Sequence, residues 1–191
     1  MLCFARNILN LNEKMKQGVW SKQLGHALNE FTIGVIGVGY VGKAVIKRAQ
    51  AFGMRVLAND IKEIPGYNLV FLEQLLKESD FISINCDLNP TSRYLINKEK
   101  IALMKPTAYL INTARGPIVK EADLIEALKN KKIAGAGLDV FEDEPLPSDS
   151  PLKKMSNVIL SPHNANAGSA AWEYVHKNTI NNLIEELVKH Q

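Results

Sequence analysis

The fold is decided by the stretch Phe31-Thr32-Ile33-Gly34-Val35-Ile36-Gly37-Val38-Gly39-Tyr40-Val41-Gly42. Residues 31–36 form a short apolar run, which is typical of a buried strand. The glycines that follow have the spacing GxGxxG, and residues 41–52 have the apolar periodicity of a helix that stops at Gly53. A glycine-rich turn between a strand and a helix predicts dinucleotide binding, because free N–H groups at the helix start can hold phosphate oxygens.

Each glycine of this turn has a separate expected role. Gly37 permits the tight turn, Gly39 lets a pyrophosphate approach the backbone, and Gly42 lets the helix pack closely on the strand. Tyr40 and Val41 stand where the helix begins. They join the three glycines as candidate cofactor-binding residues.

Asp60 lies 18 residues beyond Gly42, at the end of the next predicted strand. A carboxylate at this position can accept hydrogen bonds from the adenosine ribose hydroxyls, and it would repel a 2′-phosphate. The cofactor is therefore expected to be NAD rather than NADP. The pair Asn59-Asp60 also suits a plain turn, but its distance from the glycines makes a turn the lesser alternative.

The rest of the chain continues the alternation of strands and helices. Strands are predicted over 54–58, 81–84, 108–111, 133–138 and 158–160, and helices over 72–77, 98–104 and 121–129. Such alternation implies parallel strands with right-handed crossovers. The predicted fold class is α/β, a doubly wound parallel sheet of Rossmann type with flanking N- and C-terminal helices.

Helices are also expected at both ends of the chain. Met1, Phe4, Ile8, Leu11 and Met15 form one stripe of an amphipathic helix that Gly18 ends, and residues 19–29 are expected to be a loop. A closing helix is predicted from residue 169, with one face formed by Trp172, Val175, Thr179, Leu183 and Leu187. The expected division is a linker over 1–30, an NAD-binding domain over 31–168 and the closing helix over 169–191.

Composition narrows the class of protein. The 191 residues are 46% hydrophobic and 23% charged with a net charge of +3, which fits a globular protein and gives no concentrated basic patch for nucleic acid. No window approaches the roughly 20 apolar residues of a membrane span. Cys3 and Cys86 form no metal-spaced cluster, so no metal is expected. Reduced thiols in a cytoplasmic protein are the simplest account of the two cysteines.

Three later stretches carry a resemblance to one enzyme family. They are, in order, Ile111-Asn112-Thr113-Ala114-Arg115-Gly116, then Gly135-Ala136-Gly137-Leu138-Asp139-Val140-Phe141-Glu142-Asp143-Glu144-Pro145, and then Leu160-Ser161-Pro162-His163. Behind a GxGxxG turn, this series resembles the signature blocks of the D-isomer-specific 2-hydroxyacid dehydrogenases. The resemblance covers essentially all of the chain and implies NAD-dependent interconversion of a D-2-hydroxy acid and a 2-oxo acid.

The resemblance also implies roles for single residues. Arg115 would bind the substrate carboxylate, His163 would exchange a proton with the substrate oxygen, and Glu144 would orient the imidazole. Asp139 would lie near the nicotinamide carboxamide, and Thr113 and Ala114 would line the cofactor site beside Arg115 and His163. Taken singly, Arg115, Glu144 and His163 would each also fit an ordinary surface residue, and it is their position after predicted strands that favours catalysis.

The sequence departs from the family pattern at two places. Asp87 and Asn89 replace a Pro and a Thr that many members carry, and the segment after His163 lacks the commoner glycine. These departures suggest a subgroup that resembles phosphoglycerate dehydrogenase.

The resemblance begins inside the family's linker helix, so most of the substrate domain is expected to lie outside these 191 residues. A non-catalytic NAD(H)-binding module or a gene fragment is the alternative function. The resemblance further implies a homodimer formed by the first helix and the loop around Trp20.

Overall fold

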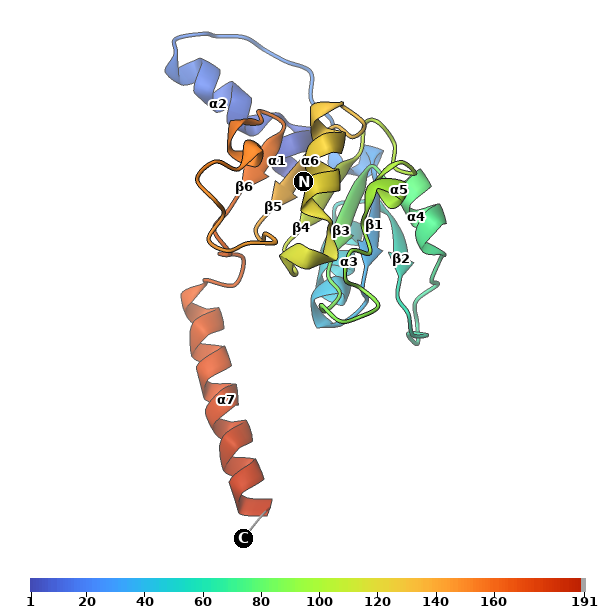
Figure 1. The fold of residues 1–191 in the computed structure, drawn as a ribbon, viewed down its shortest axis with the longest axis vertical. Coiled ribbons are helices and arrows are strands. Elements are labelled where there is room, and N and C mark those ends of the chain that lie inside the picture. The colour runs from blue at the N-terminus through green and yellow to red at the C-terminus, as the bar shows by residue number, and fades with distance from the viewer. Residues whose placement is uncertain (190–191) are drawn as a thin grey trace.

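The computed structural model describes residues 1–189 and contains a six-stranded sheet, which confirms the predicted fold class (Figure 1). All neighbouring strands are parallel, in the spatial order β2-β1-β3-β4-β5-β6. The strands are β1 (Thr32–Ile36), β2 (Arg55–Asn59), β3 (Phe81–Ile84), β4 (Tyr109–Asn112), β5 (Gly135–Leu138) and β6 (Val158–Leu160).

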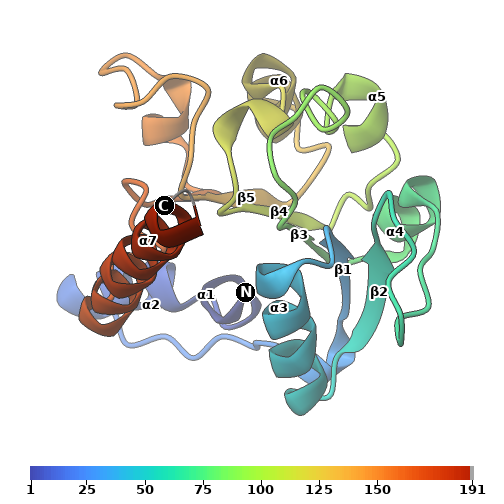
Figure 2. The same cartoon turned by 90° about the horizontal axis from the view of Figure 1, so that it is seen from below.

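Helices cover both faces of this sheet, as Figure 2 shows from below. One face carries α1 (Leu2–Ala5) and α3 (Tyr40–Ala51), and the other carries α4 (Leu72–Glu78), α5 (Lys98–Ile101) and α6 (Glu121–Lys129). Along β1, Ile33 and Val35 pack toward α3, whereas Ile36 packs into the opposite cluster. Strands buried on both sides need apolar residues at successive positions, which explains the continuous apolar runs in the sequence.

The strand order reverses at β1. The chain passes from β1 to β2 on one side and then returns to β3 on the other side. In folds of this kind, ligands bind in the crevice at the carboxyl ends of the strands beside that reversal. Here the backbones approach closely, because a Cβ placed on Gly37 would lie 2.6 Å from the backbone nitrogen of Cys86.

The bounds of most predicted helices and strands are confirmed to within one or two residues. The main exceptions are short helical segments. The helix predicted over 98–104 ends at Ile101, since Leu103 and Met104 donate to carbonyls only three residues earlier and form turns. Three short 3₁₀ helices, at Leu28–Glu30, Gly116–Ile118 and Pro151–Lys154, were not predicted.

The prediction of one continuous N-terminal helix is wrong. The segment forms α1 and a separate α2 (Ile8–Lys16), and the break lies at Asn7, whose φ of 50° is left-handed. Asn tolerates this conformation better than most residues. The break lets Phe4 stack on Tyr109 of β4, with ring centroids 4.5 Å apart, while α2 leaves the sheet and ends before Gly18.

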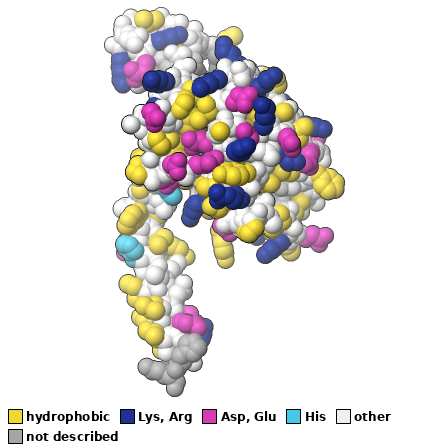
Figure 3. All heavy atoms as spheres, viewed as in Figure 1, with side chains coloured by type: hydrophobic (Ala, Val, Ile, Leu, Met, Phe, Trp, Pro, Cys, Tyr) yellow, Lys and Arg dark blue, Asp and Glu magenta, His cyan; other side chains and the backbone are white. Residues whose placement is uncertain are grey.

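The C-terminal helix α7 (Ser169–Lys189) is confirmed, but it packs differently from a helix that closes the domain. None of its residues is buried, and it points away from the sheet in Figure 1. Its expected apolar face is therefore exposed, as the yellow side chains along it in Figure 3 show. Within residues 1–189, no helix is both long and apolar enough to cross a lipid bilayer.

Candidate active site

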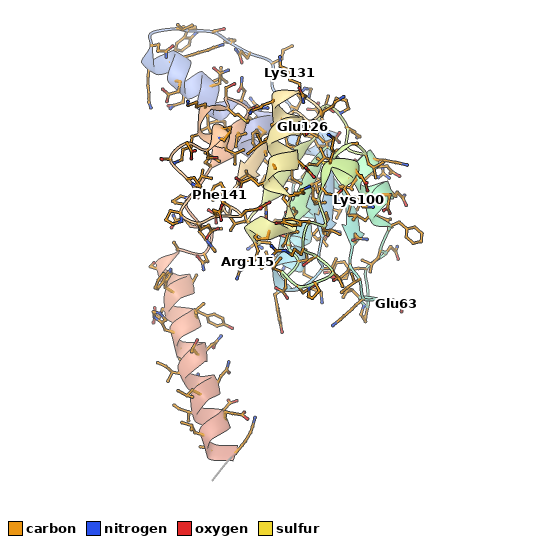
Figure 4. All side chains as sticks on the ribbon, in the orientation of Figure 1. Glu63, Lys100, Arg115, Glu126, Lys131 and Phe141 are labelled. Atoms are coloured by element: carbon orange, nitrogen blue, oxygen red, sulfur yellow. The ribbon has the colours of Figure 1, made fainter. Side chains whose placement is uncertain are left out.

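The carboxyl ends of the strands bring the predicted site residues to one edge of the sheet. The glycine turn follows β1, Asp60 follows β2, Arg115 follows β4, and His163 follows β6. Figure 4 shows Arg115 at the edge of the body that faces α7, opposite the edge that carries Lys131. Parallel strands place all their carboxyl ends on the same side, so residues distant in sequence can meet there.

The glycine turn has the geometry that its expected roles require. Gly37 has a φ of 88°, which favours glycine. A Cβ on Gly42 would overlap the carbonyl oxygen of Gly37, so the helix can approach the strand only with glycine at this position. Gly39, just before α3, has free space where its Cβ would be. This space lies beside the N–H groups of the helix start and fits a pyrophosphate.

Asp60 is held against the same turn. One of its carboxylate oxygens accepts the N–H of Val38 at 2.7 Å, and the other accepts the N–H of Lys62 at 3.1 Å. Each carboxylate oxygen has a second lone pair, so ribose hydroxyls can still donate to it. A cavity of about 310 Å³ adjoins Asp60 and is lined by Gly37, Ile61, Phe71 and Cys86.

A second cavity continues along the strand ends. Its volume is about 420 Å³, and Val41, Cys86, Thr113, Ala114 and Arg115 line it. Cys86 borders both cavities, and burial raises the pKa of its thiol, as do the nearby Asp87 and Asp60. The two cavities together offer an elongated site. Tyr40 lines neither of them and is 98% exposed, so only its backbone lies at the helix start.

Arg115 is carried by a loop that a buried side chain fixes. The amide of Asn112 accepts the N–H of Ala114 at 3.1 Å and donates to the carbonyl of Arg115 at 2.9 Å. The Arg115 side chain bonds the carbonyl of Ala114 at 2.6 Å and is exposed. The loop is therefore fixed while the guanidinium faces solvent, where it can bind an anion.

His163 and Glu144 form a hydrogen-bonded pair. The Nδ1 of His163 lies 2.7 Å from one oxygen of Glu144, and the other oxygen accepts the N–H of Phe141 at 3.0 Å. Partial burial opposes ionisation of Glu144, but the hydrogen bonds from His163 and Phe141 and the charges of His163 and Arg115 lower its pKa. Because Nδ1 is occupied, Nε2 is the ring nitrogen that is left to meet a substrate.

Asp139 fixes the segment that follows His163. Its carboxylate accepts the N–H groups of Asn164 and Ala165 at 2.8 and 2.9 Å, and its carbonyl accepts the N–H of His163 at 2.8 Å. Burial raises the pKa of Asp139, but the hydrogen bonds of Ser161, Asn164 and Ala165 outweigh that effect and lower it. Together with Thr113, Asp139 also lines a cavity of about 280 Å³.

The structure places the predicted site residues along the strand-end edge, where Glu144 meets His163, and adds others that were not predicted. Asn112 was given no role, and the signal that could have indicated one is a polar amide at the end of an apolar strand. Glu142 was given no role, yet its side chain accepts the N–H of Glu121. Nothing in the sequence spacing links positions 121 and 142.

Two glycine variants test the cofactor site. Gly39→Ala should fold with nearly unchanged stability but bind NADH about 10- to 100-fold more weakly, because one lost hydrogen bond to a charged group is worth roughly 1.5–3 kcal/mol. Gly42→Ala is the matched comparison, and it should lower the free energy of unfolding by roughly 1–3 kcal/mol through overpacking. Fluorescence titration with NADH and thermal melts measure both, and normal NADH binding by Gly39→Ala would contradict the assignment.

A doubly wound sheet with a glycine turn and a strand-end Asp defines a Rossmann-type dinucleotide-binding domain. The chain belongs to the D-isomer specific 2-hydroxyacid dehydrogenases, because the NAD-binding-domain model of that family matches residues 1–165. The predicted resemblance is thereby confirmed, and so is NAD as the cofactor of this domain type.

Individual relatives support this membership. The chain is 39% identical to a glyoxylate reductase of Korarchaeum cryptofilum over 96% of its own length and 59% of the relative's. It is 44% identical to a D-3-phosphoglycerate dehydrogenase of Methanocaldococcus jannaschii over 85% of its length and 33% of the relative's. A D-lactate dehydrogenase from Aquifex aeolicus, solved with NAD and lactic acid, superposes with a TM-score of 0.88 at 34% identity, over 98% of this chain and 63% of that one. The chain thus spans less than two thirds of the length of these relatives.

Proposed function

We propose that the protein interconverts a D-2-hydroxy acid and a 2-oxo acid with NAD, and that this chain supplies the cofactor site and the catalytic side chains. The observation that carries the proposal is the His163–Glu144 pair, with 2.7 Å between Nδ1 and the carboxylate, at the same strand-end edge as Arg115 and the glycine turn. An acid–base pair, an anion-binding guanidinium and a dinucleotide site are the groups that this reaction requires.

Each residue has a role in the reduction. NADH supplies the hydride to the carbonyl carbon of the substrate. Arg115 binds the carboxylate of the 2-oxo acid and polarises the ketone. Protonated His163 donates a proton from Nε2 to the developing alkoxide, and in the oxidation it takes this proton back. Glu144 holds Nδ1 and so orients the ring with Nε2 free to meet the substrate. Asp139 and Thr113, which line one cavity, would border the nicotinamide.

An assay of the whole protein tests the function. NADH oxidation is measured with glyoxylate, pyruvate, hydroxypyruvate and 3-phosphohydroxypyruvate, and the product is separated on a chiral column. The proposal expects turnover with at least one of these acids and a D-configured product wherever the product is chiral. Tight NADH binding without turnover of any 2-oxo acid would favour the alternative, a non-catalytic NAD(H)-binding module.

The preference for NAD is expected to depend on the charge of Asp60. A second negative charge about 5 Å from this carboxylate is unfavourable by roughly 1–3 kcal/mol, so NADH should bind about 5- to 150-fold more tightly than NADPH. Asp60→Asn removes the charge and keeps an oxygen for the N–H of Val38. This variant should narrow the gap between the two cofactors in a fluorescence titration. Equal affinities in the unmodified protein would overturn the role of Asp60.

We propose further that the protein is a cytoplasmic homodimer. Trp20 and Leu24 are 80% and 104% exposed, and Ile8 and Met15 of α2 are exposed beside the same loop. Apolar side chains gathered on one segment are typical of a contact surface. Sedimentation should therefore show a dimer at micromolar concentration, and Trp20→Ser should weaken it. The two cysteines are free, which fits a reducing compartment.

A further inference from the structure

We propose that Glu142 is a positioning residue that locks the loop of Arg115 and the loop of Glu144 into one unit. The inference rests on the proposed function, since it assigns those two side chains to the reaction. Glu142 does not reach the reacting atoms in this account. It acts through the backbone that carries Glu144 and through the helix and loop that support Arg115.

The contacts of Glu142 are reciprocal. Its side chain accepts the N–H of Glu121, at the start of α6, over 2.6 Å. Its own N–H donates to the carboxylate of Glu121 over 3.2 Å. The hydroxyl of Tyr94 donates to the second oxygen of Glu142 over 3.4 Å. Glu142 is therefore tied to a helix start and to the Tyr94 loop at the same time.

The same segment touches the loop of Arg115. A Cβ on the buried Gly116 would overlap the carbonyl group of Phe141, so the backbones of the two loops are in direct contact. The N–H of Tyr94 donates to the carbonyl of Pro117 at 2.8 Å, which joins the Tyr94 loop to the residues just after Arg115. Tyr94 thus contacts both loops, one through its hydroxyl and the other through its backbone.

Glu144 depends on this arrangement because its orientation is set by Phe141. The N–H of Phe141 donates to one oxygen of Glu144, and the other oxygen meets His163. Phe141 and Glu142 are consecutive in the chain. A shift of Glu142 therefore moves the N–H of Phe141, which orients the carboxylate of Glu144. A misplacement of about 1 Å in such a site can lower the rate about 100-fold.

The two neighbouring carboxylates of Glu121 and Glu142 are electrostatically unfavourable by themselves. Glu121 and Glu142 are both half-buried, and burial raises the pKa of Glu121, with Glu142 and Asp143 adding to the rise. Two neighbouring carboxylates repel each other, and hydrogen bonds must offset that repulsion. A simpler account is that Glu142 only caps α6, because anions favour helix starts. The two accounts differ in what they expect for Glu144.

The experiment compares Glu142→Ala with Glu142→Gln in the chain of residues 1–191. The side-chain carboxyl carbon of Glu144 is followed by ¹³C NMR across a pH titration, and Glu144→Gln assigns its signal. Glu142→Ala should let the pKa of Glu144 rise toward its ordinary value, since the contact with His163 loosens. Glu142→Gln keeps an oxygen for the N–H of Glu121, so its Glu144 titration should match the unmodified chain.

A kinetic arm uses the whole protein. Glu142→Ala should lower kcat about 10- to 100-fold with an unchanged Kd for NADH, and Glu142→Gln should stay within about threefold of the unmodified enzyme. Asp143→Ala is the matched control, because Asp143 is an exposed acid in the same loop, and it should leave both readouts unchanged. If the unmodified protein reduces no 2-oxo acid, the proposed function fails, whereas the NMR titration still decides the role of Glu142.

Several outcomes would overturn the inference. A folded Glu142→Ala with an unchanged Glu144 titration would show that Glu142 merely caps α6. Failure of Glu142→Gln to restore the titration would show that the hydrogen bond to Glu121 is not what matters. If Glu142→Ala does not fold, Glu142→Asp replaces it, because the shorter side chain should not reach both the N–H of Glu121 and the hydroxyl of Tyr94. An unchanged Glu144 titration in that variant would equally exclude the lock.

Discussion

Replacement of His163 by Asn is expected to lower kcat of the whole protein for 2-oxo acid reduction by about 10²–10⁴-fold, which is the usual contribution of a general acid–base group. Asn is a better test than Ala, because His163 has a φ of 53° and Asn tolerates this left-handed conformation. Glu144 would keep a hydrogen-bonding neighbour, but the site would lose the group that carries the proton. NADH affinity should barely change.

Steady-state kinetics and an NADH titration on the same preparation measure this effect. His26→Asn is the matched control, since His26 also pairs with a glutamate, Glu30 at 2.8 Å, but lies outside the strand-end site. It should leave kcat unchanged. Turnover by His163→Asn at the normal rate would exclude His163 as the acid–base group.

The 191-residue chain by itself is expected to bind NADH and to reduce 2-oxo acids extremely slowly or not at all. The side chains of His163 and Glu144 are 43% and 36% exposed, and the guanidinium of Arg115 faces solvent. Water would screen these groups and hydrate the ketone, which weakens electrostatic stabilisation of the transition state. A substrate open to solvent on one side would also be free to move its carbonyl carbon away from the hydride, and correct positioning can be worth about 7–11 kcal/mol.

Calorimetry with NADH and an NADH-oxidation assay with the four 2-oxo acids named above make the comparison. The result that supports the expectation is micromolar or tighter NADH binding together with turnover near the background rate. Robust turnover by the isolated chain would mean that this domain alone shields its substrate from water. Absence of NADH binding would contradict the assignment of the glycine turn.

Much of the fold could be predicted because its signals are local. The apolar run before Gly37, the glycine spacing and the helix periodicity lie within about twenty residues, and each has a direct physical cause. The break at Asn7 could not be predicted in this way, because it accompanies a tertiary contact, the stacking of Phe4 on Tyr109, that local periodicity does not reveal. Periodicity continued through the break, so the stripe indicated one helix where tertiary contacts favour two.

The residues of the site could be predicted from the sequence, but the hydrogen bonds between them could not. Family resemblance placed Arg115, Glu144 and His163, and the structure shows the last two in contact across 19 residues of sequence. Asp139 was expected at the nicotinamide, and the hydrogen bonds that its carboxylate accepts from the N–H groups of Asn164 and Ala165 were not expected. Tyr40 was named because it starts a helix, yet its side chain points to solvent. Residue type and order indicate membership, whereas side-chain direction depends on the assembled loops.

The close approach of Gly37 to the backbone of Cys86 has a consequence for biosynthesis. A parallel sheet has no strand pair that a tight hairpin can close, so each pairing must wait for a distant segment. During translation at about 5–20 residues per second, β1 and its glycine turn emerge several seconds before β3. Until then β1 lacks its neighbour β3 and the backbone of Cys86 that packs against the glycine turn. We therefore expect nascent chains that end before residue 86 to be unable to retain NAD, and to expose an apolar strand that invites aggregation or chaperone binding.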